Sequence, residues 1–234
     1  MKGLSFSTPM VIAWNEDRKW VTRRLMNPQP PQDNGTGRWL FTVCSTARKE
    51  RATWNFSEVN DSGHNYTERG RELELWRGKP RYLPGETVYI KEAHYLYGSW
   101  KKNGLAASGR QKWLFVADRS MGVLFPDALP TDFVSSQGRD HRGWFKRSPR
   151  FMPAWAARSH ARIVSVRPER IQEITGEDCS REGMEEHYFG GYDFAYLGMP
   201  PEAANFRRTW ESLHPGSWEK NEFVWRIALE KVTK

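Results

Sequence analysis

Lys19 and Thr22 are the side chains of this 234-residue sequence whose types and spacing best fit nucleophilic chemistry. A threonine hydroxyl attacks a carbonyl carbon only after a base has taken its proton. A lysine can be that base when burial or nearby positive charge lowers its pKa, and Arg18, Arg23 and Arg24 surround Lys19 in sequence. Extended backbone would point Lys19 and Thr22 to opposite faces, so we expect a helix end or turn between them. Lys-x-x-Thr is also a common pattern, typical of an exposed lysine and a strand threonine.

Three more charged residues near Lys19 and near a predicted strand have two interpretations each. Arg23 and Arg24 would either bind phosphate in bidentate fashion or form a solvated charge pair. Glu92 ends the predicted strand 87–93, where it would either face a cleft as a second carboxylate or pair with a surface arginine. The residues alone leave both alternatives open.

Residues 139–151 interleave cations with aromatic rings. The cations are Arg139, Arg142, Lys146, Arg147 and Arg150, and the rings are Trp144, Phe145 and Phe151. Aromatic stacking among cations holds single-stranded nucleic acid without reading its sequence. The alternative is a loop whose aromatic side chains anchor it to the core of the protein.

The charge distribution also favours a polyanionic partner. The net charge is +8, and residues 101–170 alone carry 14 basic and 5 acidic residues, whereas residues 171–234 carry 7 and 12. Such a surface fits nucleic acid, although net charge also serves solubility. Twelve Trp, twelve Phe and eight Tyr exclude wholesale disorder.

Several classes of protein are not expected from the composition. No apolar run approaches the roughly 20 residues of a membrane span, and the N-terminus lacks the apolar stretch of a secretory signal. Cys44 and Cys179 stand alone, which argues against a zinc ribbon or disulfide framework and fits a reducing cytosol. The spacing of the six histidines suggests no metal site, and no glycine-rich fingerprint suggests a nucleotide cofactor, so we expect neither.

The elements that must position these residues are short strands with a few helices. We expect a helix from Thr8 to near Lys19, opened by Pro9, and an extended segment over 20–25. Strands are predicted at 38–44, 87–93, 113–117, 161–167 and 223–230, and helices at 175–186 and 203–213. This order predicts an α+β fold, a small barrel with short flanking helices.

Blocks spread over nearly the whole chain resemble the ASCH branch of the PUA-like superfamily, in particular its bacteriophage and prophage members, often labelled morphogenetic or hypothetical proteins. The blocks are residues 6–10, 17–24, 84–92, 149–158, 166–172 and 182–184. The resemblance implies one PUA-like β-barrel domain over 1–234 with an open cleft, and insertions at about 32–80 and 94–145.

The resemblance also implies RNA or modified nucleosides as ligands. Small ASCH proteins include an amidohydrolase that removes acetate from 4-acetylcytidine and a reported ribonuclease. The amidohydrolase is similar in its Lys-x-x-Thr motif, here Lys19 and Thr22, and in a downstream glutamate that falls on Glu182. The implied mechanism has Thr22 attack, Lys19 activate it and Glu182 shuttle protons.

Three function classes follow. The first is a hydrolase acting on RNA or a modified nucleoside with these three residues, any nuclease activity being metal-independent. The second is an RNA-binding module without catalysis, which uses the same cleft and the segment 139–151. The third is a phage assembly or host-takeover protein that binds a host or phage protein partner. All three are expected in the cytoplasm, that of the host cell if the gene belongs to a phage.

Overall fold

The computed structural model describes residues 1–30, 38–44, 53–59, 67–68, 71–72, 76–184 and 201–232, with secondary structure alone for 38–77. The described chain is a mixed α+β protein with many strands and few helices. Contacts divide it into two compact units. The first comprises Met1–Ile12, Thr87–Ala161 and Lys231–Lys234, and the second Ala13–Glu86 and Arg162–Glu230. The single domain over 1–234 stays a prediction.

In the first unit, β1 (Lys2–Ser5) pairs in parallel with β8 (Thr87–Lys91), and the buried side chains Leu4 and Ile90 lie at paired positions. Three short 3-10 turns join the strands of this unit: η1 (Arg119–Met121), η2 (Pro149–Phe151) and η3 (Ala154–Ala156). Tyr89 packs against Met152, Ala156 and Ala157, so the segment after η2 covers β8.

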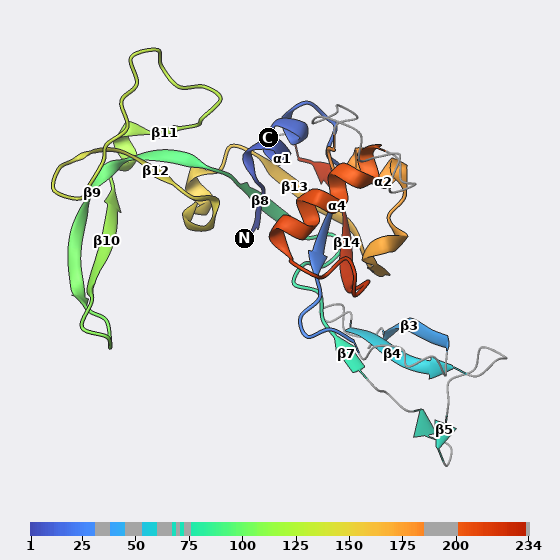
Figure 1. The fold of residues 1–234 in the computed structure, drawn as a ribbon. Coiled ribbons are helices and arrows are strands. Elements are labelled where there is room, and N and C mark those ends of the chain that lie inside the picture. Colours follow the sequence, from blue (N-terminus) through green and yellow to red (C-terminus); the bar gives the residue numbers. More distant parts are fainter. Residues whose placement is uncertain are drawn as a thin grey trace. The chain divides into compact units, whose positions relative to one another are not determined.

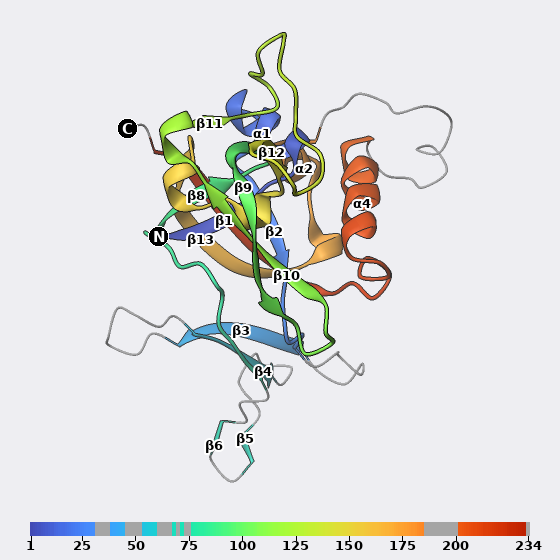
Figure 2. The same cartoon turned by 90° about the vertical axis from the view of Figure 1, so that its left-hand side faces the viewer.

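The first unit also contains a long antiparallel hairpin of β9 (His94–Leu105) and β10 (Gln111–Ala117), visible in Figures 1 and 2. The strands β11 (Val123–Leu124) and β12 (Gly143–Arg147) pair with the first half of β9. A Cβ at Gly98 would lie 2.3 Å from the Val116 carbonyl oxygen, so glycine allows the two hairpin strands to approach closely. Within segment 94–145, expected as a loop insertion, β9, β10, β11 and the start of β12 form one sheet, in which aromatic residues pair across the strands.

In the second unit, β14 (Phe223–Lys231) lies between β13 (His160–Arg170) and β2 (Val21–Leu25). The turn η4 (Ile171–Glu173), the helix α2 (Gly176–Arg181) and the helix α4 (Pro201–Leu213) contribute its core. Phe206 and Trp210, one helical turn apart on α4, stack with ring centroids 5.8 Å apart and pack with Val224 of β14 and Cys179 of α2.

The remaining strands of the second unit form two small sheets. β3 (Arg38–Cys44), β4 (Thr53–Val59) and β7 (Trp76–Gly78) make one, and β5 (Thr67–Glu68) and β6 (Arg71–Glu72) make the other. The strand predicted at 38–44 is confirmed. The rest of the expected insertion at 32–80 lies mostly outside the described residues.

The expected barrel does not close within the described residues. One physical reason lies at the outer edge of β2. The Trp20 carbonyl accepts from Leu229 of β14, whereas the Trp20 N–H donates to the Arg181 carbonyl. The end of α2 therefore pairs with the residue that directly precedes β2, where a closing strand would begin to pair.

The helix α1 (Thr8–Asn15) begins where it was predicted but ends four residues before Lys19. Asp17 adopts a positive φ of 59°, and the Ala13 carbonyl accepts from the amides of both Arg18 and Lys19, which closes the helix end. The turn thus precedes Lys19 instead of following it. The predicted helix 175–186 begins as expected but ends at Arg181, while residues 185–186 lie outside the described part.

None of the described helices is long and apolar enough to cross a membrane.

Candidate functional site

Lys19 and Glu182, 163 residues apart, lie together in the second unit. Their backbones form an antiparallel β-bridge, and both side chains are almost fully buried. The Lys19 Nζ donates to Glu182 Oε2 at 2.7 Å, to the Glu182 carbonyl at 2.8 Å and to the Val21 carbonyl at 2.9 Å. The last contact places the amine against the Val21–Thr22 peptide group.

Arg23 lies next to this pair and contacts three carboxylates. Its Nε donates to Glu169 at 2.6 Å, and its two terminal nitrogens donate to Glu182 at 3.2 Å and to Asp178. Arg226, paired with Arg23 across β14 and β2, binds both oxygens of Asp178. We call these six residues the Lys19 cluster: Lys19, Arg23, Glu169, Asp178, Glu182 and Arg226.

Thr22 and Arg24 alternate with Arg23 along β2, so their side chains leave the strand on its opposite face. Thr22 is only 2% exposed. Arg24 is half-buried and donates to the Arg23 carbonyl at 3.0 Å. Burial lowers the pKa of Arg24, against the opposing effect of Glu182. No turn separates Lys19 from Thr22, and the long lysine side chain reaches the Thr22 peptide instead.

Gly183 makes the close approach of Glu182 to Lys19 sterically feasible. Its φ is +85°, a conformation that L side chains rarely adopt. A Cβ at this position would lie 2.5 Å from the Ala13 Cβ and 3.3 Å from the Lys19 Cβ. The residue after Glu182 therefore has to be small where it passes the end of α1.

In the Lys19 cluster, burial and the charges of neighbouring residues shift pKa values in opposite directions. Burial lowers the pKa of Lys19, opposed by Glu182, and the neighbouring Arg24 and Arg23 lower it further. Hydrogen bonds from Arg226 and the charge of Arg23 hold the pKa of Asp178 well below its usual range. Burial raises the pKa of the Cys179 thiol to about 12, so a thiolate is not available here at neutral pH.

The sequence patterns do not single out three members of the Lys19 cluster as site residues. Asp178 belongs to the predicted helix start, Arg226 to the predicted strand 223–230, and Glu169 follows the predicted strand 161–167. The signal that could have found Arg226 is a charged residue inside the apolar strand 223–229. Such a residue predicts a buried partner of opposite charge.

The predicted segment 139–151 is divided between two sheet faces and a turn. β12 places Trp144 and Lys146 on one face and Phe145 and Arg147 on the other. Trp144 packs edge-on against Tyr97 at 5.6 Å between centroids, and Lys146 is exposed. The five predicted cations and their rings are therefore not one continuous loop surface, because strand alternation separates them.

Two other arginines of that segment have contacts of their own. Arg142 pairs with Asp118 and lies over the Tyr97 ring at 5.5 Å. Arg150 is exposed on η2, and its carbonyl accepts from the Lys91 Nζ at 2.6 Å. Arg147 has no carboxylate partner among the described residues and lies over three aromatic rings.

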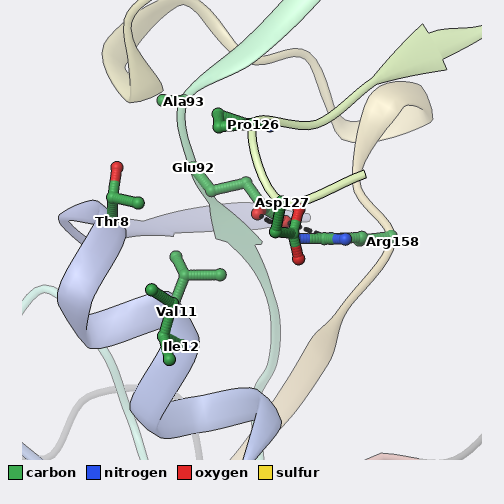
Figure 3. Close-up of a pocket in the computed structure, with 8 residues that line it drawn as sticks. All are labelled: Thr8, Val11, Ile12, Glu92, Ala93, Pro126, Asp127 and Arg158. Atoms are coloured by element: carbon green, nitrogen blue, oxygen red, sulfur yellow. Dashed lines mark hydrogen bonds and ion pairs between the residues drawn. The ribbon is translucent and has the colours of Figure 1, made fainter. Parts of the chain in front are cut away.

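Glu92 belongs to the first unit, where it lines a small pocket (Figure 3). Its carboxylate accepts two hydrogen bonds from Arg158, which also binds both oxygens of Asp127. Burial, together with the charge of Asp127, raises the pKa of Glu92, and Arg158 opposes the shift. Of its two interpretations, the pairing with an arginine is the one the contacts support.

Among the described residues, no group of three or more His, Cys, Asp and Glu side chains is arranged to hold a metal ion. His64 and His187 lie outside the described part.

The chain matches no protein-family model, no curated protein and no solved structure in the comparisons made.

Proposed function

We propose that this protein is an ASCH-type, PUA-like hydrolase that acts on RNA or a modified nucleoside at Lys19, Thr22 and Glu182. The observation that carries the proposal is the Lys19–Glu182 contact of 2.7 Å between residues 163 positions apart. These are residues that the resemblance assigns to one centre. The lysine amine also contacts the carbonyl of the Val21–Thr22 peptide group, while the Thr22 side chain leaves β2 on the face opposite to Arg23.

The proposed reaction cleaves an amide such as the N-acetyl group of 4-acetylcytidine. The Thr22 hydroxyl oxygen bonds to the amide carbonyl carbon while its proton passes to a neutral Lys19 amine. The tetrahedral intermediate then collapses, the C–N bond breaks, and the leaving nitrogen takes a proton. Water hydrolyses the resulting threonine ester, so the net products are the free amine and acetate.

Glu182 is proposed to carry protons to and from Lys19. Its Oε2 accepts directly from the lysine Nζ, so a proton can move between the two without a bridging group. Burial favours the neutral lysine that the first step needs, because it lowers the pKa of Lys19. Arg23 holds the other carboxylate oxygen of Glu182 and thereby positions it.

Thr22 offers the sharpest test, because no member of the Lys19 cluster can be changed without disturbing buried ion pairs. Purified wild type is expected to release cytidine from 4-acetylcytidine, as followed by chromatography. Thr22→Val keeps the side-chain shape and should abolish turnover, while Thr22→Ser keeps a hydroxyl and should retain part of it. Equal turnover of Thr22→Val and wild type, with both folded by circular dichroism, would contradict the proposal.

A second candidate is an RNA-binding module without catalysis. It is favoured by the fact that Lys19 already donates three hydrogen bonds, which use every proton of an ammonium group. Absence of turnover on 4-acetylcytidine and on RNA, with RNA binding retained, would support this candidate. Absence of both, with co-purification of a host or virion protein, would instead support the assembly or host-takeover role.

A further inference from the structure

One face of the β9–β10–β12 sheet gathers aromatic rings from three strands. Trp100 lies opposite Phe115, and Trp113 lies opposite Lys102, two residues further along β9. Phe145 of β12 belongs to the same face, because its partner Leu96 is an even number of residues from Trp100. Trp100, Phe115 and Phe145 contact one another edge to face, with centroids 5.2–6.2 Å apart.

Two guanidinium groups lie over these rings. Arg147 is 4.8 Å from the centroid of Trp100, 4.6 Å from that of Phe115 and 5.1 Å from that of Phe151. Arg139 is 5.3 Å from Trp100 and 5.4 Å from Trp113. The Trp100 ring thus contacts both arginines. We call these residues the arginine–aromatic face: Trp100, Trp113, Phe115, Arg139, Phe145, Arg147 and Phe151.

Neither arginine of this face has a carboxylate partner among the described residues. Segment 94–117 contains no Asp or Glu at all, but it holds Lys101, Lys102, Arg110 and Lys112. The acids near these residues in sequence do not pair with either arginine: Asp118 pairs with Arg142, and Glu92 and Asp127 pair with Arg158. Asp140, which follows Arg139 directly, forms no ion pair with it. The face therefore presents positive charge that the described part of the chain leaves without a counter-charge.

Two buried nitrogens at the base of this face lack a hydrogen-bond partner among the described residues, Arg147 Nε and His94 Nε2. The two residues are directly paired across β12 and β9. Burial lowers the pKa of His94, whose Nδ1 lies 3.0 Å from the Glu92 carbonyl. An imidazole is neutral or positively charged, so His94 supplies no negative counter-charge to Arg147. Burial also lowers the pKa of Arg147, because it disfavours the charged guanidinium. An anion bound at this group would stabilise its charge.

We propose that the arginine–aromatic face binds single-stranded nucleic acid. The half-buried rings of Trp100, Trp113 and Phe115 and the exposed ring of Phe151 offer stacking surfaces for bases. Arg147 and Arg139 offer planar cations to the phosphates. Charge complementarity selects this occupant, because a protein or second copy with an apolar contact surface would leave both guanidinium groups buried without an anion.

This inference does not depend on the hydrolase chemistry, because no residue of the Lys19 cluster belongs to the face. If the hydrolase proposal also holds, binding at this face would indicate that the substrate of the hydrolase is a nucleic acid polymer. The failure of one proposal can be told from the failure of the other, since binding and turnover are measured separately.

The test is the fluorescence anisotropy of a labelled 12-nucleotide RNA titrated with the full chain, repeated with DNA of the same sequence and over a salt series. Arg147→Gln and Arg139→Gln should each weaken binding about tenfold and lower the salt slope by about 0.7 for each phosphate that is no longer neutralised. Arg147→Lys keeps the charge without the planar stack and should fall between. Arg162→Gln, which removes an exposed arginine paired with Glu230, is the matched control and should bind as wild type.

Binding of RNA and DNA alike would indicate recognition by stacking and phosphate contacts, whereas binding of RNA alone would indicate contacts to the 2′-hydroxyl, and both support the proposal. Absence of binding by the wild type would overturn it, as would equal losses in Arg147→Gln and Arg162→Gln. Sedimentation that shows a second copy of the chain on this face, without nucleic acid binding, would overturn it as well.

Discussion

Arg23 in the second unit donates to three carboxylates, whereas Arg147 in the first unit lies over three aromatic rings and has no carboxylate partner among the described residues. The charge of Arg23 is neutralised inside the protein. It therefore holds β2, α2 and β13 together and is not available to a ligand. The charge of Arg147 remains open to an anion that the described chain does not supply.

The two regions should therefore differ in how much stability a substitution removes. Removal of a buried charge leaves its partners unpaired, which costs more free energy than the pair itself contributes. Removal of a stacked, half-exposed arginine leaves only rings, which need no counter-charge. We therefore expect the Lys19 cluster to dominate stability and the arginine–aromatic face to dominate binding.

The largest expected effect is that of Arg23→Met. This change leaves Glu169, Asp178 and Glu182 without their shared cation and should lower the free energy of unfolding by about 3–5 kcal/mol. Urea denaturation followed by circular dichroism measures it. Arg162→Gln, at an exposed pair, should change stability by less than about 1 kcal/mol. Equal losses of stability in Arg23→Met and Arg162→Gln would contradict a dominant role of the Lys19 cluster in stability.

Gly183→Ala should destabilise the protein by about 1–3 kcal/mol, because alanine is strained at a positive φ and its Cβ would press on Ala13. Gly176→Ala provides the control, since a Cβ there meets nothing within 4 Å and no positive φ is involved. That variant should be neutral or slightly more stable. Thermal unfolding of both proteins decides the point, and a destabilised Gly176→Ala with an unchanged Gly183→Ala would contradict it.

Stability should fall in acid through Asp178. Its pKa is lowered in the folded state by Arg226 and Arg23, so its contribution is present above the unfolded value of about 3.8 and is lost as the pH falls below it. Urea titrations at pH 5 and pH 3 measure the difference. Asp178→Asn should be less stable at pH 5 and show a smaller loss between the two pH values; an unchanged pH dependence would count against the assignment.

Arg147→Gln should have only a small effect on stability. Loss of its ring contacts should cost at most about 1 kcal/mol, in contrast to Arg23→Met. Parallel urea denaturation of the two variants sharpens the comparison. A loss for Arg147→Gln as large as that for Arg23→Met would mean that this arginine is structural.

Much of the element order could be predicted from the sequence, because local patterns specify it. The strand 38–44 and the start of the helix at Thr175 follow from alternation and capping, as does the strand at 223–230. The pairing of Lys19 with Glu182 could be anticipated only through the resemblance, since nothing local links residues 163 positions apart.

Other features depend on tertiary contacts and could not be predicted. The early end of α1 depends on the Ala13 carbonyl accepting from two amides. The sheet formed by 94–147 depends on β12 pairing with β9, which divides Trp144 and Arg147 between opposite faces. The role of Asp178 depends on Arg226 reaching it from β14. In each case a partner distant in sequence decides the outcome.

The most direct test measures turnover of 4-acetylcytidine and affinity for a labelled single-stranded RNA on the same preparations of Thr22→Val and Arg147→Gln. The account predicts that Thr22→Val loses turnover and keeps wild-type affinity, while Arg147→Gln keeps turnover of the free nucleoside and loses about tenfold in affinity. Loss of both properties in either variant, with the fold intact, would contradict the division of roles between the two regions.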